Sequence, residues 1–319
     1  AVYAGRSLSQ QELKTGTPNW WSEYYRPNAA NIAENTWKPL VTQLTNPTEL
    51  LNILKRNRRN TASGYDAIPS GLLKIMTNTY FNTPSISPIT PTVNAHFLTA
   101  YVNALLRTGI MPPSQKEGII TLVPKPGKDP SIALNRRPVT LLPELGKLPF
   151  KILAKRLTSI FNDNPNLLNP QQRAYLRNGS TRQCLDLLVD VTRHAQLENS
   201  NLFITTYDIQ KCFDSIQHYS IKATLVRYDF PEEFANLVMS ALQNATSRVQ
   251  TFHGLTEPIK LLTSVRQGDP LAALIFILIV DTLFTGLANN PIFPNSTNGY
   301  TVINVHNIAA NHTVHCTPE

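Results

Sequence analysis

The sequence of 319 residues contains few cysteines, and they lie far apart. The cysteines at positions 184, 212 and 316 are too few and too scattered for a disulfide framework, and no two of them have the spacing of zinc ligands. This composition favours a reducing, intracellular location, and it does not distinguish the nucleus from the cytoplasm.

Long apolar segments are also absent. The most apolar run, Leu271 to Val280, lies between Asp269 and Asp281 and is too short to cross a bilayer. The amino end lacks the basic region and apolar core of a signal peptide. We therefore expect no membrane partner, and the absence of an initiator methionine suggests a fragment.

Charged side chains are missing from one part of the chain. Between Thr282 and Pro318 the sequence contains no Asp, Glu, Lys or Arg. The whole chain nevertheless has 29 Lys and Arg against 21 Asp and Glu, a net charge of +8 at pH 7. Such an excess suits a polyanionic partner such as nucleic acid, although it also fits a merely basic protein.

Hydrophobic residues make up 42% of the sequence, enough for a substantial core in two lobes or one large domain. Local patterns predict a mixture of helices and strands. Asn46 and Pro47 have the order of an N-cap and a first helical residue, and Thr181 can cap another helix. The expected elements are helices at 47–59, 72–76, 96–106, 147–157, 181–192, 215–228, 231–242 and 271–287, strands at 118–124, 136–142 and 202–207, and a hairpin around 253–254.

Asp208 is the residue around which the rest of the chain is interpreted. The β-branched and aromatic residues of 202–207 predict a half-buried strand, so Asp208 would lie at the carboxyl end of that strand. Ligand and metal groups are common at this position in α/β sheets, whereas a solvated turn residue or cap is the alternative for a single Asp. Asp214 is expected to cap the helix that follows it.

Cations gather at two further places. Lys125 and Lys128 occupy a tight turn after an expected strand, where they either contact phosphate or keep a hairpin tip soluble. The helix 147–157 has apolar residues along one face and places Lys147, Lys151 and Arg156 elsewhere. A basic helix side suits a nucleic-acid backbone, and a solvated face is the alternative.

From Ser63 to about Leu287, the order of these pieces resembles the reverse transcriptase domain of non-LTR retrotransposons. Five short motifs carry the resemblance, and the two palm motifs are the most specific. In chain order they are the opening turn Ser63–Asp66, the fingers hairpin in Ile120–Asp129 and Arg137–Leu142, the element Gln172–Tyr175 before the palm, and the first and second palm motifs Asp208–Asp214 and Gln267–Leu271.

The resemblance implies an α+β fold, with the fingers and palm of a right-hand polymerase and without a thumb. Residues 1–60 would then form an irregular lead-in and a helix, residues 61–199 the fingers region, and residues 200–319 a palm with a degenerate C-terminal tail.

The resemblance also implies an RNA-directed DNA polymerase that uses an RNA template, a DNA primer and deoxynucleoside triphosphates. Two Mg²⁺ ions would assist nucleotidyl transfer, with catalytic Asp208 and the Ile209 carbonyl as metal ligands. Phe213 would lie under the incoming sugar and exclude a 2′-hydroxyl, unless it is a core residue. The other implied contacts are Gln267, Gly268, Lys125, Lys128 and Arg137 for the nucleotide, and Arg136, Lys147, Lys151 and Arg173 for template or primer.

The third palm motif of the family, an aromatic residue and Ala followed by two Asp, is where this sequence departs from the pattern. The best alignment places Asn311 and His312 at the two Asp positions. Asn has no charge, and the His nitrogen suits Mg²⁺ poorly, so we expect impaired polymerisation. The alternatives are a catalytically dead nucleic-acid-binding remnant and a maturase-type RNA-binding protein. The sequence makes no prediction of oligomeric state.

Overall fold

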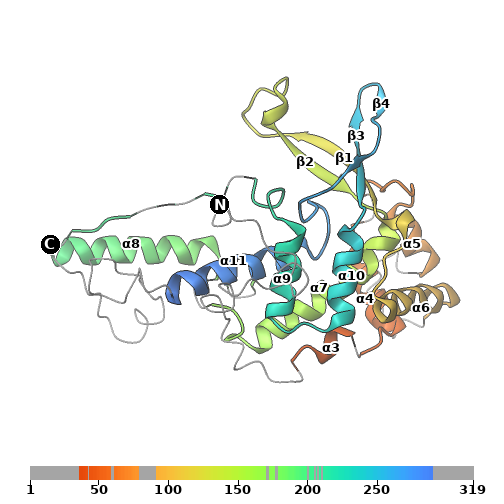
Figure 1. The fold of residues 1–319 in the computed structure, drawn as a ribbon, viewed down its shortest axis with the longest axis horizontal. Helices are drawn as coiled ribbons and strands as arrows, with labels where there is room; N and C mark the ends of the chain where they lie inside the picture. Colours follow the sequence, from red (N-terminus) through yellow and green to blue (C-terminus); the bar gives the residue numbers. More distant parts are fainter. Residues whose placement is uncertain are drawn as a thin grey trace.

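The computed structural model describes residues 36–41, 43–58, 61–78, 91–169, 172–176, 179–199, 201–204, 206, 208–209 and 211–289. A body of helices carries a small sheet whose two hairpins project from one side (Figure 1). The helices are α3 (Lys38–Val41), α4 (Pro47–Arg56), α5 (Ser70–Met76), α6 (Val93–Thr108), α7 (Glu144–Asp163), α8 (Thr181–Leu197), α9 (His218–Arg227), α10 (Glu232–Leu242) and α11 (Ala272–Asn289). The strands are β1 (Glu117–Pro124), β2 (Arg136–Leu141), β3 (Thr246–Thr251), β4 (Gly254–Leu255) and β5 (Ile259–Lys260).

The sheet has the order β2-β1-β3-β4, and β5 pairs with β3. β1 and β2 form an antiparallel hairpin, as the sequence predicts, and the second hairpin joins β3 to β4 across Phe252 and His253. β1 and β3 pair in parallel, so their carboxyl ends lie at the same edge of the sheet. The helices and the sheet together agree with the α+β expectation at the level of mixed helix and strand content.

Helix starts follow local capping chemistry. The Asn46 side chain accepts a hydrogen bond from the Glu49 amide at 2.8 Å, and Pro47 opens α4, which confirms the predicted start. The prediction for α8 was one residue wrong, because Ser180 is the N-cap and accepts from the Gln183 amide at 3.3 Å. Ser180 precedes Thr181 and offers the same hydroxyl oxygen, so sequence pattern alone distinguishes the two poorly.

The core is built around α7, whose Leu148, Ile152 and Leu157 are fully buried. Helix α11 also contributes apolar residues to this core, as its sequence predicts. None of the helices in the described part of the chain is both long and apolar enough to cross a membrane. Helix α4 contributes Leu50 and Leu54 to the same core.

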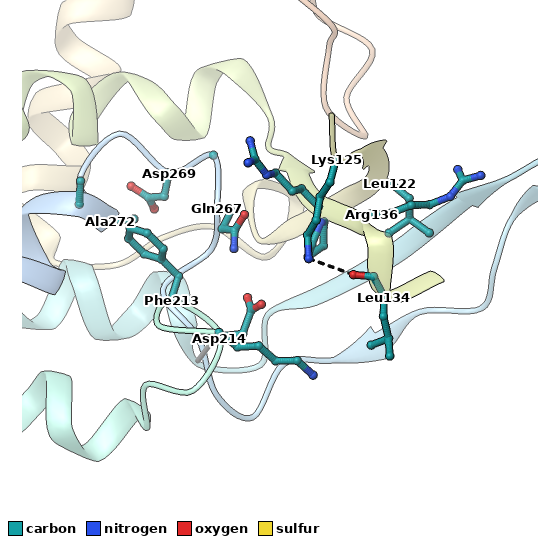
Figure 2. Close-up of a pocket in the computed structure, with 14 residues that line it drawn as sticks. Leu122, Lys125, Leu134, Arg136, Phe213, Asp214, Gln267, Asp269 and Ala272 are labelled. Atoms are coloured by element: carbon teal, nitrogen blue, oxygen red, sulfur yellow. Dashed lines mark hydrogen bonds between the residues drawn. The ribbon is translucent and has the colours of Figure 1, made fainter. Parts of the chain in front are cut away.

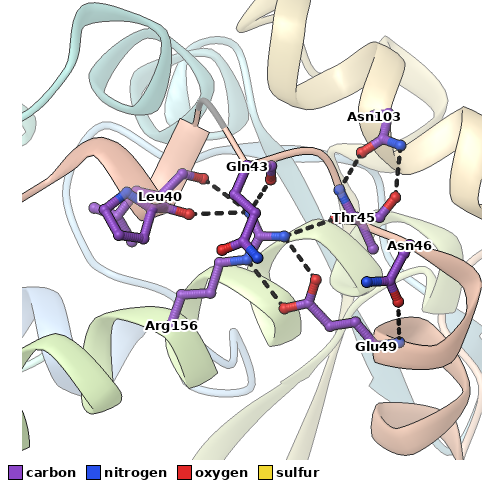
Figure 3. Close-up of polar contacts among 8 residues, drawn as sticks. Leu40, Gln43, Thr45, Asn46, Glu49, Asn103 and Arg156 are labelled. Carbon is purple, nitrogen blue, oxygen red and sulfur yellow. Dashed lines mark hydrogen bonds and ion pairs between the residues drawn. The ribbon is translucent and has the colours of Figure 1, made fainter.

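Arg156 does not belong to a basic outer side of α7, because only 7% of its surface is exposed. Its guanidinium forms two hydrogen bonds to the Glu49 carboxylate, at 3.0 and 2.6 Å, and it donates to the backbone carbonyl of Gln43 at 2.6 Å (Figure 3). The planar guanidinium can satisfy several acceptors at once, so Arg156 joins α7 to α4 and to the segment after α3. Its expected position on the basic side was wrong.

The expected strand at 202–207 was also wrong within the described residues. Residues 201–204, 206, 208 and 209 have no regular secondary structure, and 86% of the Phe203 surface is exposed. A strand is stable only when a neighbouring strand accepts and donates its backbone hydrogen bonds. None of the described strands pairs with this segment, although its composition is suitable.

Candidate active site

A pocket of about 780 Å³ lies where the β1–β2 hairpin meets the loop before α11 and the turn before α9 (Figure 2). Its apolar lining comes from Leu122, Leu134, Pro138, Ala272 and Ala273. The residues with predicted contacts that line it are Lys125, Arg136, Arg137, Phe213, Gln267 and Gly268. The fold therefore brings together residues from three distant segments of the chain.

The loop Gln267–Gly268 is held against β2 by its backbone. The Thr140 amide donates to the Gln267 carbonyl at 2.7 Å. Gly268 has φ +128°, and a Cβ atom at this position would be 2.1 Å from the Thr140 carbonyl oxygen. A side chain is therefore excluded by both space and backbone conformation. The close approach that Gly268 permits in this structure is to β2, and its expected contact with a nucleotide stays a prediction.

Beside this loop, the charged residue Arg266 is buried and Asp269 is partly buried. Arg266 is 3% exposed and donates to the carbonyls of Lys116, at 2.8 Å, and Ala241, at 3.1 Å. Burial lowers the pKa of Arg266, and the charge of Asp269 opposes this shift. Burial likewise raises the pKa of Asp269, whose carboxylate accepts from the Leu271 amide at 2.8 Å. These bonds fix the loop that carries Gln267.

Phe213 lines the pocket and also packs into the protein. Its ring is 4.9 Å from the ring of Phe276 on α11, measured between centroids. Its carbonyl accepts from the Val265 amide at 3.1 Å. The side chain is partly buried, so Phe213 is a packed residue with one side facing the pocket. This position is compatible with both interpretations of the sequence, a core residue and a nucleotide contact.

The cations of the β1–β2 hairpin are oriented by backbone carbonyls. The Lys125 amine donates to the Leu134 carbonyl at 2.9 Å, and Arg136 Nε donates to the Pro130 carbonyl at 2.8 Å. Arg137 lines the pocket and is exposed. Lys128 lies on the exposed turn and is not part of the pocket lining. The hairpin thus presents three of its four cations to the pocket.

Asp208 and Ile209 are both exposed, and neither lines this pocket. The acids that do are Asp214 and Asp269. Figure 2 shows the carboxylate of Asp214 facing the same space as the side chain of Gln267. The expected cap role of Asp214 was wrong, because Gln217 is the N-cap of α9 and no side chain caps that helix. The sequence signal for Asp214 was its position as the last residue of the first palm motif, next to Phe213, and Lys211 in the same turn was missed altogether.

The residues predicted to contact template or primer have different environments in the structure. Lys147 and Lys151 both form ion pairs with the buried carboxylate of Glu144, the first at 2.5 Å. Burial lowers the pKa of Lys151, and the charge of Glu144 opposes the shift. Both lysines therefore stabilise the start of α7, and nucleic-acid contacts by them stay a prediction. Arg173 is partly exposed and lies outside the pocket.

The described residues do not fit a two-ion magnesium site. No group of three or more His, Cys, Asp and Glu side chains capable of holding a metal occurs among them. The aligned positions Asn311 and His312 lie outside the described residues, and they supply no carboxylate. Two Mg²⁺ ions need several converging oxygen ligands, of which Asp208 would be one.

Comparisons with known proteins support the family resemblance of the sequence. Residues 123–305 match the family described as reverse transcriptase (RNA-dependent DNA polymerase). The chain is 32% identical over 175 residues to a Pol polyprotein from the type-1 retrotransposable element R2 of Popillia japonica, covering 54% of this chain and 23% of the relative. It is 26% identical over 288 residues to an R2 polyprotein of Nasonia vitripennis, covering 90% of this chain and 25% of the relative.

A third relative is the probable RNA-directed DNA polymerase from transposon X-element of Drosophila melanogaster. It is 26% identical over 236 residues, which cover 73% of this chain and 24% of the relative. The chain thus spans about a quarter of the length of these curated relatives.

Proposed function

The chain belongs to the reverse transcriptase (RNA-dependent DNA polymerase) family, and from this we propose that it is the polymerase domain of a non-LTR retrotransposon, with impaired catalysis. Its fold would be the fingers and palm of a right-hand polymerase. The substrates would be deoxynucleoside triphosphates, added to a DNA primer on an RNA template. The relatives carry the names of retrotransposon polyproteins and polymerases, which supports this assignment.

One observation carries the proposal: five of the six residues expected to contact a nucleotide line a single pocket. They are Lys125, Arg137, Phe213, Gln267 and Gly268. They come from three segments whose neighbours along the chain are more than 50 positions apart, so their convergence depends on the whole fold. Lys128 is the exception.

The pocket has the chemistry of a nucleotide site. Lys125 and Arg137 supply positive charge for a triphosphate, and Arg can bind phosphate oxygens through two parallel hydrogen bonds. Phe213, packed against Phe276, offers a flat apolar surface to the sugar. This surface would leave no room for a 2′-hydroxyl. Gln267 offers an amide to a base or sugar. The chain's own residues thereby bind and orient the nucleotide.

The residues of this chain give little support for catalysis. The family generally uses Mg²⁺, but the described residues lack a cluster of ligands for it, and the sequence from Thr282 to Pro318 lacks acids. The second candidate function, a catalytically dead nucleic-acid-binding remnant, is favoured by this shortage. Both candidates require the same cationic hairpin, and they differ in whether nucleotide is incorporated.

Binding of a fluorescent deoxynucleoside triphosphate to the full chain tests the pocket. We expect Arg137→Ala to weaken binding roughly tenfold, because it removes a charged hydrogen-bond donor from the lining. Lys128→Ala is the matched control, since it removes the same charge from the same hairpin outside the pocket. Equal losses in the two variants would show that only general electrostatic attraction is involved.

Primer extension on an RNA template with Mg²⁺ separates the two candidates. We expect no incorporation by this chain. Incorporation that disappears in Asp208→Ala would contradict the proposed impairment and would make Asp208 a catalytic residue.

A further inference from the structure

The turn between β3 and β4 presents an aromatic side chain to solvent. Phe252 is 98% exposed, and its ring contacts the edge of the His253 ring at a centroid distance of 5.4 Å. A side chain so exposed contributes almost no burial energy to the fold. Its presence at this tip is therefore not explained by packing.

The backbone holds this tip in one conformation. Thr251 pairs with Gly254 across the hairpin. The Thr251 hydroxyl donates to the Gly254 carbonyl at 2.8 Å and accepts from the His253 amide at 3.2 Å. At the base of β3, Arg248 is anchored by Glu117, with 2.6 Å between Nε and the carboxylate. A fixed turn loses little conformational freedom when its side chain binds a partner.

Phe252 lies at the sheet edge that also carries the cationic hairpin. β1 and β3 are parallel neighbours, so the turn after β1 and the turn after β3 leave the sheet on the same side, as Figure 1 shows. Residues 125–137 contain four cations, Lys125, Lys128, Arg136 and Arg137, and one acid, Asp129. The edge thus combines an exposed ring with an excess of positive charge.

This combination fits one kind of partner. Proteins that bind single-stranded nucleic acids pair a positive surface for phosphates with aromatic rings on which bases stack. A duplex hides the faces of its bases, so an exposed ring can stack only on an unpaired base. Singly exposed apolar residues are common on protein surfaces. Phe252 is distinguished by its fixed turn and by its place at the same sheet edge as the β1–β2 cations.

We infer that the β3–β4 tip is a base-stacking contact for single-stranded nucleic acid, with Phe252 against an unpaired base and the β1–β2 cations along the phosphates. The identity of that strand as an unpaired RNA template rests on the proposed function. Phe252 does not line the nucleotide pocket, so stacking on its ring is separate from nucleotide binding, whereas Lys125, Arg136 and Arg137 also line that pocket.

The test measures the affinity of the full chain for a short fluorescent single-stranded RNA and for the same strand without bases. Phe252→Ala should weaken binding of the RNA about tenfold and leave binding of the abasic strand unchanged, because stacking needs a base. The dependence of affinity on salt should keep its slope, since no phosphate contact is removed. Phe252→Trp should bind the RNA as well as the wild type.

Phe97→Ala is the matched control, since Phe97 is also largely exposed, at 70%, and belongs to α6, which lies away from the tips of both hairpins in Figure 1. Unchanged RNA affinity in Phe252→Ala, an equal loss on the abasic strand, or no RNA binding by the wild type would each overturn the inference. Nucleotide binding to the pocket is measured separately. A wild type that binds RNA through Phe252 but binds no nucleotide would contradict the proposed function and leave the stacking contact standing.

Discussion

Individual residues in this protein have environments that are hard to replace. Gly268 occupies a backbone conformation with φ +128° beside the Thr140 carbonyl, and Asp281 on α11 is a carboxylic acid that is only 1% exposed. The position of neither residue needs a ligand to explain it. Both have measurable consequences for stability.

Gly268→Ala should destabilise the fold and distort the pocket, because its Cβ would meet the Thr140 oxygen at 2.1 Å and the backbone conformation is unfavourable. We expect a loss of about 2–4 kcal/mol in the free energy of unfolding, measured with urea. Gly127→Ala separates the two causes: Gly127 also has positive φ, at +69°, but a Cβ there meets nothing within 4 Å. A loss no larger than that of Gly127→Ala would show that the β2 contact is unimportant.

Asp281 should make stability depend on pH. The Tyr228 hydroxyl donates to its carboxylate at 2.5 Å and the Asn169 amide at 2.6 Å, yet burial is the larger influence and raises the pKa of Asp281 to about 6. The folded state therefore holds this proton up to a higher pH than the unfolded state does. The contribution of Asp281 to stability is greatest below pH 4 and falls as the pH rises to about 6.

Through Asp281, the unfolding free energy of the wild type should fall by roughly 2–3 kcal/mol between pH values below 4 and pH values above 6. We expect Asp281→Asn to lack this fall. The measurement is the difference in unfolding free energy between variant and wild type at several pH values, because other carboxylates titrate equally in both proteins. A difference that does not change between pH 4 and 7 would refute the assignment.

At the scale of elements, α7 connects the helices through charges as well as through apolar contacts. Glu144 near its start pairs with Lys147 and Lys151, and Arg156 in its second half pairs with Glu49 of α4. Arg156 and Glu144 are buried, at 7% and 2% exposure. Removing one partner of a buried pair leaves the other charge without compensation.

Arg156→Met should lower the unfolding free energy by about 3–5 kcal/mol, because Glu49 loses its partner and the Gln43 carbonyl loses its donor. The neighbouring Lys155→Met removes the same charge from an exposed position of α7 and should change stability by less than about 0.5 kcal/mol. Urea unfolding of both variants measures the difference. Similar small effects in both would mean that the Arg156 bonds contribute little.

The elements also show how far the sequence predicts this fold. Helix starts such as Asn46–Pro47 and the buried helix α11 follow from local chemistry and apolar length, and both are confirmed. The strand at 202–207 was predicted from composition, but its pairing depends on another segment that local pattern does not contain. Lys147, Lys151 and Arg156 looked like one basic helix side, because a helical pattern does not reveal which acids lie opposite each cation.

In the candidate site, some residues were predictable from local sequence motifs, and others are placed only by tertiary packing. Phe213, Gln267 and Gly268 were found through short motifs, and the structure places them in one pocket. Lys211 and the pocket position of Asp214 were missed, because only the packing of the turn before α9 against the α11 loop brings them there. Their roles in nucleotide binding stay predictions.

At the scale of the whole molecule, the net charge of +8 is available to a polyanion, and the exposed Lys128 and Arg137 place part of the positive charge on the β1–β2 hairpin. We expect affinity for an RNA–DNA duplex to fall steeply with salt, because phosphate contacts release counterions. Binding isotherms at several salt concentrations measure the slope. Affinity that does not change with salt would contradict a phosphate-binding surface.

The bonds of Arg156 also decide where this chain can be shortened. Residues 36–58 place Trp37 and Leu40 in the core, and they supply the acceptors described above for the Arg156 guanidinium. A recombinant fragment that begins near residue 61, just before the turn Ser63–Asp66, would keep the pocket residues. It would leave the Arg156 guanidinium without these acceptors and would expose apolar core residues that α3 and α4 cover. Such a fragment should aggregate on expression, whereas one that begins before Thr36 should remain dispersed.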